Sequence, residues 1–210
     1  MGRQMKKKTD FSDLKRQERD NRRNLIMDAA QRVFAANPFD KVNMRQIAKE
    51  VGISPGSLYI YFENQEALFI EVSLQGADKL IKMLRGLDKG DPSCVAKAAL
   101  AYIDFITENY EYLCMMQHSM LYGKFTSADS LEKLIRTYRE LFTEFDAVLK
   151  NVAPEAKLRT YSHLFFASLN GILFSYGRFP ERGGDEALVH MRELAAMFAE
   201  LFTKGKPLAP

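Results

Sequence analysis

The sequence predicts an all-α fold, in which a small amino-terminal helical unit precedes a larger helical domain. Apolar residues recur at helical spacing along almost all of the 210 residues, which is the pattern of amphipathic helices. No segment alternates apolar and polar residues between turn signals, so we predict no strands. Glycine and proline interrupt the helical pattern at short intervals, as they do between helices joined by short loops.

The helices can be placed in order from this pattern. The first begins between Ser12 and Arg19. It ends at Asn37, because Pro38 disfavours helical geometry in the residue before it. Residues 1–11 show no periodicity and are expected to be flexible. Further helices are predicted at about 44–51, 55–61, 64–87, 93–108, 109–122, 128–150, 154–176 and 185–203.

Positive charge is concentrated at the amino-terminal end. The formal net charge is +3, but residues 1–23 carry nine basic and four acidic side chains, a net +5 that leaves −2 for the rest. A local excess of this kind points to an anionic partner, with nucleic acid as the leading candidate. We assign residues 1–18 to a basic flexible arm, although a feature that only aids solubility would have the same composition.

Composition excludes several other classes of protein. With 47% hydrophobic residues the chain can bury a core, and it has no apolar run of about 18 residues that would span a membrane. The charged start lacks the apolar segment of a secretory signal. Two cysteines and three histidines are scattered and form neither a disulfide framework nor a metal spacing. We therefore expect a soluble cytoplasmic protein without a metal or another cofactor.

Residues 43–62 have the features of two short helices joined by a tight turn. Gly52 suits the left-handed conformation that ends the first helix. Asn43 and Ser54 are suited to cap the two helices, and Pro55 fits the first position of the second. Each residue type suits its own place in a helix-turn-helix, and hydroxyl groups on the second helix can bond phosphates or base edges.

Residues in and before this motif also match a known family. They are Ala29, Ala30, Phe34, Phe39, Ile47-Ala48, Gly52-Ile53-Ser54, Gly56-Ser57-Leu58-Tyr59, Tyr61-Phe62 and Leu68. Over about residues 20–70 the chain resembles the TetR (tetracycline repressor) family of transcriptional regulators. The resemblance implies an all-helical homodimer that is not an enzyme. It assigns residues 19–66 to DNA binding and residues 67–210 to ligand binding and dimerisation.

The resemblance also implies a set of DNA contacts. Carried over by position, the DNA-binding residues are Asn43, Arg45, Ser54, Pro55, Gly56, Ser57, Tyr59, Tyr61 and Gln65. Two positions depart from the family pattern. Pro38 replaces a usual Gly, and Gln65 replaces a Lys that commonly holds a phosphate. Arg45 also fits a solvated surface position, and Tyr59 and Tyr61 also fit ordinary packing positions.

The second domain is rich in aromatic residues, since residues 100–180 hold 15 of the 24 in the chain. This composition fits a plain core or the wall of an apolar pocket. Candidate ligand-binding residues are Tyr102, Phe105, Met115, Met116, His118, Met120, Tyr122, Tyr138, Phe142, Phe166 and Asn170. Candidate dimer-interface residues, on the last two predicted helices, are Tyr161, Phe165, Ser168, Leu169, Ile172, Leu194, Phe198 and Leu201.

Together these features predict a ligand-responsive transcriptional regulator. We expect a repressor that binds a near-palindromic operator of double-stranded DNA as a homodimer. A small apolar or aromatic effector would release it by binding the two states of the protein with different affinity. The alternatives are an enzyme that acts on nucleic acid and an architectural DNA-binding protein, each using the helix-turn-helix only for docking. An enzyme would need clustered carboxylates or a nucleophile, and we identify no such arrangement in residues 66–210.

Overall fold

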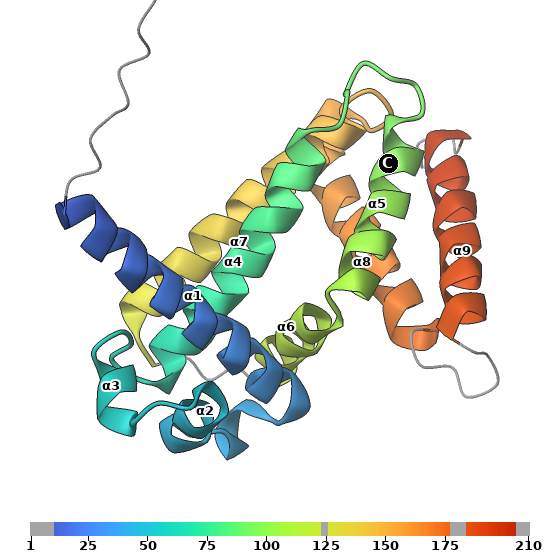
Figure 1. Cartoon of the computed structure of the whole chain (residues 1–210). Helices are drawn as coiled ribbons and strands as arrows, with labels where there is room; N and C mark the ends of the chain where they lie inside the picture. Colours follow the sequence, from blue (N-terminus) through green and yellow to red (C-terminus); the bar gives the residue numbers. More distant parts are fainter. Residues whose placement is uncertain (1–10, 123–125, 177–183, 205–210) are drawn as a thin grey trace, which may run out of the picture.

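The computed structural model describes residues 11–122, 126–176 and 184–204, with residues 117–122 described by their backbone alone. These residues contain nine α-helices and two short 3-10 turns and no strand, so the predicted all-α fold is confirmed. A small unit made of the first three helices lies at one end of a larger body formed by the other helices (Figure 1).

The helices follow the predicted order. They are α1 (Phe11–Ala36), α2 (Met44–Val51), α3 (Pro55–Tyr59), α4 (Gln65–Arg85), α5 (Cys94–Glu108), α6 (Tyr110–Tyr122), α7 (Ala128–Leu149), α8 (Leu158–Tyr176) and α9 (Gly184–Lys204), with 3-10 turns η1 (Phe39–Lys41) and η2 (Glu155–Lys157). The helix predicted from residue 154 therefore starts as a 3-10 turn, and the α-helix begins at Leu158.

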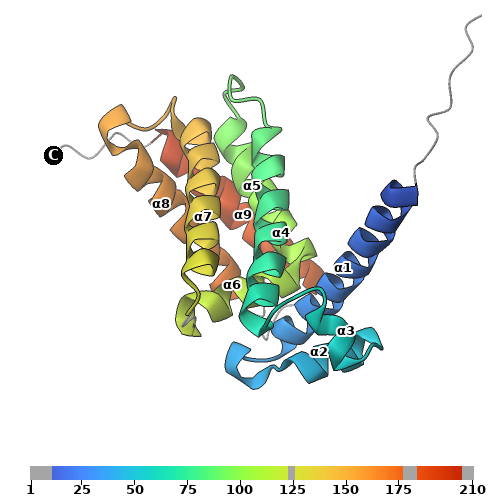
Figure 2. The ribbon, with the colours of Figure 1, turned by 90° about the vertical axis from the view of Figure 1, so that its left-hand side faces the viewer.

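The first half of α1 corrects the predicted flexible arm. Residues 11–18 are helical and exposed, and they extend away from the helical body (Figure 2). Side-chain pairs support this exposed segment: Arg22 Nη2 lies 2.6 Å from Glu18 Oε1 one turn away, and the Lys15 ammonium lies 4.8 Å from the centre of the Phe11 ring. Residues 1–10, the rest of the predicted arm, lie outside the described residues.

The amino-terminal core is formed by α1, α2, α3 and the start of α4. Three phenylalanines gather at its centre, where the Phe69 ring lies 5.0 Å from Phe34 and 5.0 Å from Phe39. Phe39 belongs to η1, so this cluster fixes the loop between α1 and α2. The core includes Val72 on α4. It therefore extends past the domain boundary that we predicted at residue 66, because α4 is continuous through that point.

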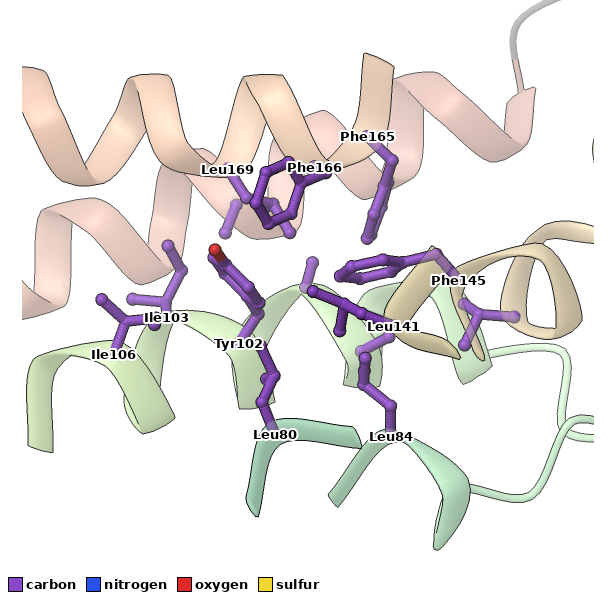
Figure 3. Close-up of a cluster of buried hydrophobic side chains, with 14 of the residues drawn as sticks. Leu80, Leu84, Tyr102, Ile103, Ile106, Leu141, Phe145, Phe165, Phe166 and Leu169 are labelled. Carbon is purple, nitrogen blue, oxygen red and sulfur yellow. The ribbon is translucent and has the colours of Figure 1, made fainter. Parts of the chain in front are cut away.

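The carboxy-terminal core is larger and lies among α4, α5, α7, α8 and α9. Figure 3 shows Leu80 and Leu84 of α4 below the Tyr102 ring of α5, with Phe145 of α7 and Phe165 of α8 to one side. All five side chains are almost completely buried. Aromatic rings dominate this core, with centroids about 6 Å apart.

Two helices join the cores. α4 contributes residues 68–72 to the first core, and its later turns contribute to the second. α6 does the same within one turn, because Met115 is buried in the first core while Leu113 and Met116 are buried in the second. Near the start of α4, Glu66 also accepts hydrogen bonds from Thr126 and from the backbone of the α7 cap. A movement of α4 or α6 therefore reaches both cores.

Candidate nucleic-acid interface

The geometry of residues 43–62 is that of a capped helix-turn-helix. Asn43 Oδ1 accepts from the Gln46 amide at 3.0 Å, and Gln46 Oε1 accepts from the Asn43 amide at 2.8 Å. These reciprocal bonds form a capping box at the start of α2. Gly52 ends the helix with φ of 79°, in the left-handed region that glycine tolerates. Ser54 Oγ accepts from the Ser57 amide at 3.1 Å and caps α3.

The start of α3 faces away from the core that fixes the helix. Leu58 is completely buried and anchors α3, whereas Pro55 and Gly56 are exposed. Tyr59 is 53% exposed. These small and hydroxyl-bearing surface groups are the type that a recognition helix presents to a groove. The structure therefore leaves the predicted DNA-binding residues of α3 accessible.

Arg45 on α2 is a free cation close in sequence to this surface. Its side chain is exposed, and no hydrogen bond or ion pair joins it to any residue that the structure describes. The guanidinium group can therefore turn toward a partner without breaking an internal contact. Lys49, one turn later on the same helix, is also exposed and forms no hydrogen bond or ion pair with any described residue.

Tyr61 and Gln65 have internal contacts that their predicted DNA-binding role did not include. Tyr61 is half-buried against the first core. Gln65 Nε2 donates to the Phe39 carbonyl oxygen at 2.5 Å, so it ties the first turn of α4 to η1. This bond gives a physical reason for glutamine at a position where the family commonly has Lys.

Arg23 is a structural residue, although its charge was counted in the positive excess of residues 1–23. Its guanidinium group lies 4.4 Å from the centre of the Phe62 ring and 3.1 Å from Glu71 Oε2. It also donates to the Tyr61 carbonyl oxygen at 3.3 Å. These contacts hold α1, the segment after α3, and α4 together. The pattern of charge alone did not distinguish Arg23 from its exposed neighbour Arg22.

A charged groove lies between the first half of α1 and the segment after α3. Its volume is about 330 Å³ and it is lined by Lys15, Glu18, Arg19, Arg22, Ile60 and Tyr61. The hydrogen bond that Arg22 donates to the Glu18 carboxylate raises the pKa of Arg22 above its ordinary value, so this group stays charged. Three cations in one groove beside the end of α3 can attract a phosphate backbone.

In the second domain, a small cavity lies between α4, α6 and α7, and we call it the α4–α6–α7 cavity. Of the predicted ligand-binding residues, Met116 and Tyr138 line it. Tyr112, Ser73 and Thr137 line it too, and the sequence analysis missed all three. The helical spacing of apolar residues gave no signal for them, because the cavity depends on how three distant helices pack.

Several of the predicted ligand-binding residues do not line this cavity. Tyr102 is completely buried, and its hydroxyl donates to Asn170 Oδ1 at 3.1 Å, so these two residues satisfy each other inside the core. Met115 belongs to the amino-terminal core. The remaining described members, Phe105, Phe142 and Phe166, pack in or against the aromatic core. The side chains of His118, Met120 and Tyr122 lie outside the described residues.

The predicted dimer residues need a similar correction. Phe165 and Leu169 are completely buried in the core of their own chain and cannot present a surface to a second subunit. Tyr161, Ser168, Ile172, Leu194 and Phe198 are half-buried, and Leu201 is 71% exposed. The exposed large apolar side chains of α8 and α9 are Leu164, Phe174, Val189, Met197 and Leu201. Both helices are apolar on most sides, so sequence periodicity did not show which side faces inward.

Two kinds of feature are absent from the described part of the chain. No helix within it is long and apolar enough to cross a membrane. Its His, Cys, Asp and Glu side chains form no group of three or more that could hold a metal ion.

Comparison with known proteins agrees with the helix-turn-helix geometry. A profile of the family described as "Bacterial regulatory proteins, tetR family" matches residues 26–72. The HTH-type transcriptional regulator YfiR of Bacillus subtilis (strain 168) is 27% identical over 182 residues, which cover 81% of this chain and 87% of YfiR. Similarity to a relative thus extends well beyond the amino-terminal unit.

Solved structures show the same overall fold. The fatty acid degradation regulator FadR from Bacillus halodurans has a TM-score of 0.69 at 15% identity, over 89% of this chain and 96% of that one. The regulator FadR from Bacillus subtilis, in complex with stearoyl-CoA, has a TM-score of 0.67 at 16% identity, over 87% and 98% of the two chains. These proteins are regulators rather than enzymes. Residues 26–72 thus match the amino-terminal unit of the TetR family of transcriptional regulators, and the described chain shares its fold with solved transcriptional regulators.

Proposed function

We propose that this regulator is a ligand-responsive repressor that binds a near-palindromic operator as a homodimer. The observation that carries the proposal is the exposed face formed by the tip of α3 and the unpaired Arg45 of α2. Tyr59 and the hydroxyl groups of α3 would contact the major groove and its phosphates, and Arg45 would reach a base edge. The charged groove along α1 would hold the neighbouring backbone.

The first half of α1 supplies the electrostatic part of this proposal. Residues 24–65 carry four basic and four acidic side chains, so the helix-turn-helix itself is neutral. The cations of the charged groove lie on the exposed segment before it. Long-range attraction to DNA would therefore come from α1 and the residues before it, and specificity from α2 and α3.

A homodimer would cover apolar surface that a single chain leaves exposed. Leu164 and Phe174 on α8, and Val189, Met197 and Leu201 on α9, are each more than half exposed. The two helices also pack against each other. Burial of these side chains between two copies would form a four-helix interface and present two α3 helices to successive major grooves.

The effector would be apolar or aromatic and would bind within the second domain. The α4–α6–α7 cavity has mainly apolar walls, and none of its described lining residues is charged. The FadR structure from Bacillus subtilis was solved with stearoyl-CoA, a ligand with a long apolar chain. Both observations support a ligand of this class, whose binding would favour an arrangement of α4 that does not fit the operator.

The proposal can be tested by selecting binding sites from a pool of random DNA duplexes with the full chain. We expect the selected sites to share a palindrome with half-sites about one helical turn apart or somewhat more. Arg45→Ala and Tyr59→Ala should each weaken binding about tenfold, since a contact to a base or phosphate contributes roughly 1–3 kcal/mol. Lys150→Ala, which removes an exposed cation after the far end of α7, is the matched control.

Two outcomes would count against the proposal. Binding without sequence preference would favour an architectural DNA-binding protein. Folded Arg45→Ala and Tyr59→Ala variants that bind as well as Lys150→Ala would remove α2 and α3 from the interface. Analytical ultracentrifugation gives the oligomeric state, and a monomer bound to a single half-site would contradict the homodimer.

A further inference from the structure

The α4–α6–α7 cavity is small but chemically well defined. Its volume is about 20 Å³, which is room for about one water molecule. Apolar side chains supply most of its wall, and its hydroxyl-bearing lining residues are Ser73, Tyr112, Thr137 and Tyr138. A site with apolar walls, a few polar groups and no charged side chain among its described lining residues suits an uncharged ligand.

Among the residues that the structure describes, none forms a hydrogen bond with the buried hydroxyl of Tyr112. The residue is 8% exposed. An unsatisfied buried hydroxyl costs roughly 1–3 kcal/mol, so most buried tyrosines find a partner. Tyr102, in the same core, donates to Asn170. Burial raises the pKa of Tyr112 well above its ordinary value, so its hydroxyl keeps the proton and remains a donor.

The position of the Tyr112 ring depends on a glycine in α4. A Cβ atom at Gly76 would overlap the ring, because it would come within 2.9 Å even of Tyr112 Cγ. The ring therefore lies directly against the α4 backbone, at a distance that only glycine permits. The Phe105 ring of α5 also packs edge-on against the Tyr112 ring, with centroids 6.3 Å apart. The unsatisfied hydroxyl is thus held in place by close packing on two helices.

We propose that the Tyr112 hydroxyl donates a hydrogen bond to the effector, an uncharged apolar molecule with one acceptor oxygen. The inference rests on the proposed function, in which an apolar effector binds this domain. A molecule larger than water would have to separate α4 from α6 and α7. Because α4 continues into the amino-terminal core at residues 68–72, that separation would act on the DNA-binding unit.

The test compares two single-atom changes in the full chain. Tyr112→Phe removes the unsatisfied hydroxyl, and Tyr102→Phe is the matched control that removes a bonded one. The probes are butyrophenone and butylbenzene, which share a phenyl ring and a four-carbon chain and differ by a ketone oxygen. Wild type should bind butyrophenone about three- to tenfold more tightly than butylbenzene, as one hydrogen bond provides. Tyr112→Phe should lose this preference, and Tyr102→Phe should keep it.

Unfolding in urea supplies a second readout. Tyr112→Phe should unfold at the same urea concentration as wild type or a higher one, because it removes an unsatisfied group. Tyr102→Phe should unfold at a lower concentration, because Asn170 loses its partner. Gly76→Ala should displace the ring and abolish the preference for butyrophenone in a chain whose helical circular dichroism is unchanged.

Three results would overturn the inference. They are no binding of butyrophenone to wild type, an unchanged preference in Tyr112→Phe, and a Tyr112→Phe variant as destabilised as Tyr102→Phe. DNA binding separates this failure from that of the proposed function. If the chain binds its operator but not butyrophenone, the Tyr112 site is contradicted and the proposed DNA-binding function is retained. If the ketone binds through Tyr112 but does not change the DNA affinity, the Tyr112 site is supported and the proposed release of DNA by an effector is contradicted.

Discussion

The two cores of the molecule differ in how fully their buried and capping polar groups are paired. In the amino-terminal unit, side chains cap α2, α3 and α4, and the aromatic side chains at its centre are phenylalanines without polar atoms. In the carboxy-terminal core, Tyr102 has a partner and Tyr112 has none among the described residues. A unit that docks on DNA gains from one fixed geometry. A unit that takes up a ligand can retain an unpaired donor for it.

The largest expected effect comes from Phe69→Ala in the amino-terminal core. Phe69 is 1% exposed and contacts both Phe34 and Phe39. Its removal should lower the free energy of unfolding by about 3–5 kcal/mol. Phe145→Ala, at a completely buried position of the second core, is the matched variant and should cost a similar amount. Urea unfolding followed by circular dichroism measures both changes.

The two variants should differ in DNA binding. At a urea concentration where both remain folded, Phe69→Ala should lose more affinity for DNA, because the cluster that positions η1 and α2 is broken. Equal losses would mean that the two cores act as one mechanical unit. A cost below about 1 kcal/mol for Phe69→Ala would contradict the close packing of the cluster.

Two neighbouring arginines provide a second, smaller test. Arg23→Gln removes a cation–π contact worth roughly 0.5–1 kcal/mol and a partly exposed ion pair worth roughly 0–1 kcal/mol, so it should lower the free energy of unfolding by about 0.5–2 kcal/mol. Arg22→Gln should leave the urea midpoint unchanged. Instead it should reduce the slope of log affinity against log salt by about one, as expected for one lost phosphate contact. If Arg22→Gln lowered the stability and Arg23→Gln changed only the salt dependence of DNA binding, the structural role of Arg23 would be contradicted.

Local sequence signals predicted the amino-terminal unit well, because its geometry is set over short distances. The cap at Asn43, the left-handed Gly52 and the Ser54-Pro55 start of α3 are each readable from residue type. Residue type alone could not reveal the internal roles of Gln65 and Arg23. Their partners are 26 or more residues away in the sequence, and only the packing of α1 and α4 brings them together.

The second domain was less predictable for the same reason. The order of the helices and most of their ends followed from periodicity, but the side of each helix that faces the core did not. Phe165 and Leu169 were predicted for a dimer interface and lie in the core. Tyr112 was not predicted at all, since its importance depends on Gly76 opposite and on the lack of a hydrogen-bonding partner among the described residues. A missing hydrogen-bonding partner produces no pattern that can be recognised in a single sequence.

Glu66 links the two units and gives a pH-dependent prediction. Its carboxylate accepts from the Thr126 amide and hydroxyl at 3.1 and 2.9 Å and from the Ser127 amide at 2.9 Å. Partial burial alone would raise the pKa of Glu66, but these hydrogen bonds outweigh it and lower the pKa. Because the folded-state pKa is depressed, the stabilisation is complete above the ordinary value of about 4.3 and is lost as the pH falls below it.

Glu66→Gln should therefore lower the free energy of unfolding by about 1 kcal/mol near neutral pH and by less at acidic pH. The measurement is the free energy of unfolding of both proteins from about pH 7 to pH 3, where the difference should shrink as the carboxylate is protonated. Glu63→Gln, an exposed acid before α4, is the control. A difference that stays constant with pH would mean that the charge of Glu66 does not contribute to the link between α4 and α7.

The smallest expected effect, Gly56→Ala at the tip of α3, separates stability from DNA binding most cleanly. A Cβ atom there would have only Ser54 Oγ within 4 Å, at 3.9 Å, so the folded chain accepts it without strain. Alanine restricts the unfolded chain, and the variant should gain about 0.5 kcal/mol. Its DNA affinity should nevertheless fall, because the added methyl group stands where the backbone of α3 would approach the groove. Gly86→Ala, whose Cβ would lie 3.5 Å from the nearest atom at the far end of α4, should change stability to a similar extent and leave DNA affinity unchanged. If Gly56→Ala bound DNA as tightly as Gly86→Ala, close approach of the α3 tip would be excluded, and Tyr59 and Arg45 would have to reach the DNA from a greater distance.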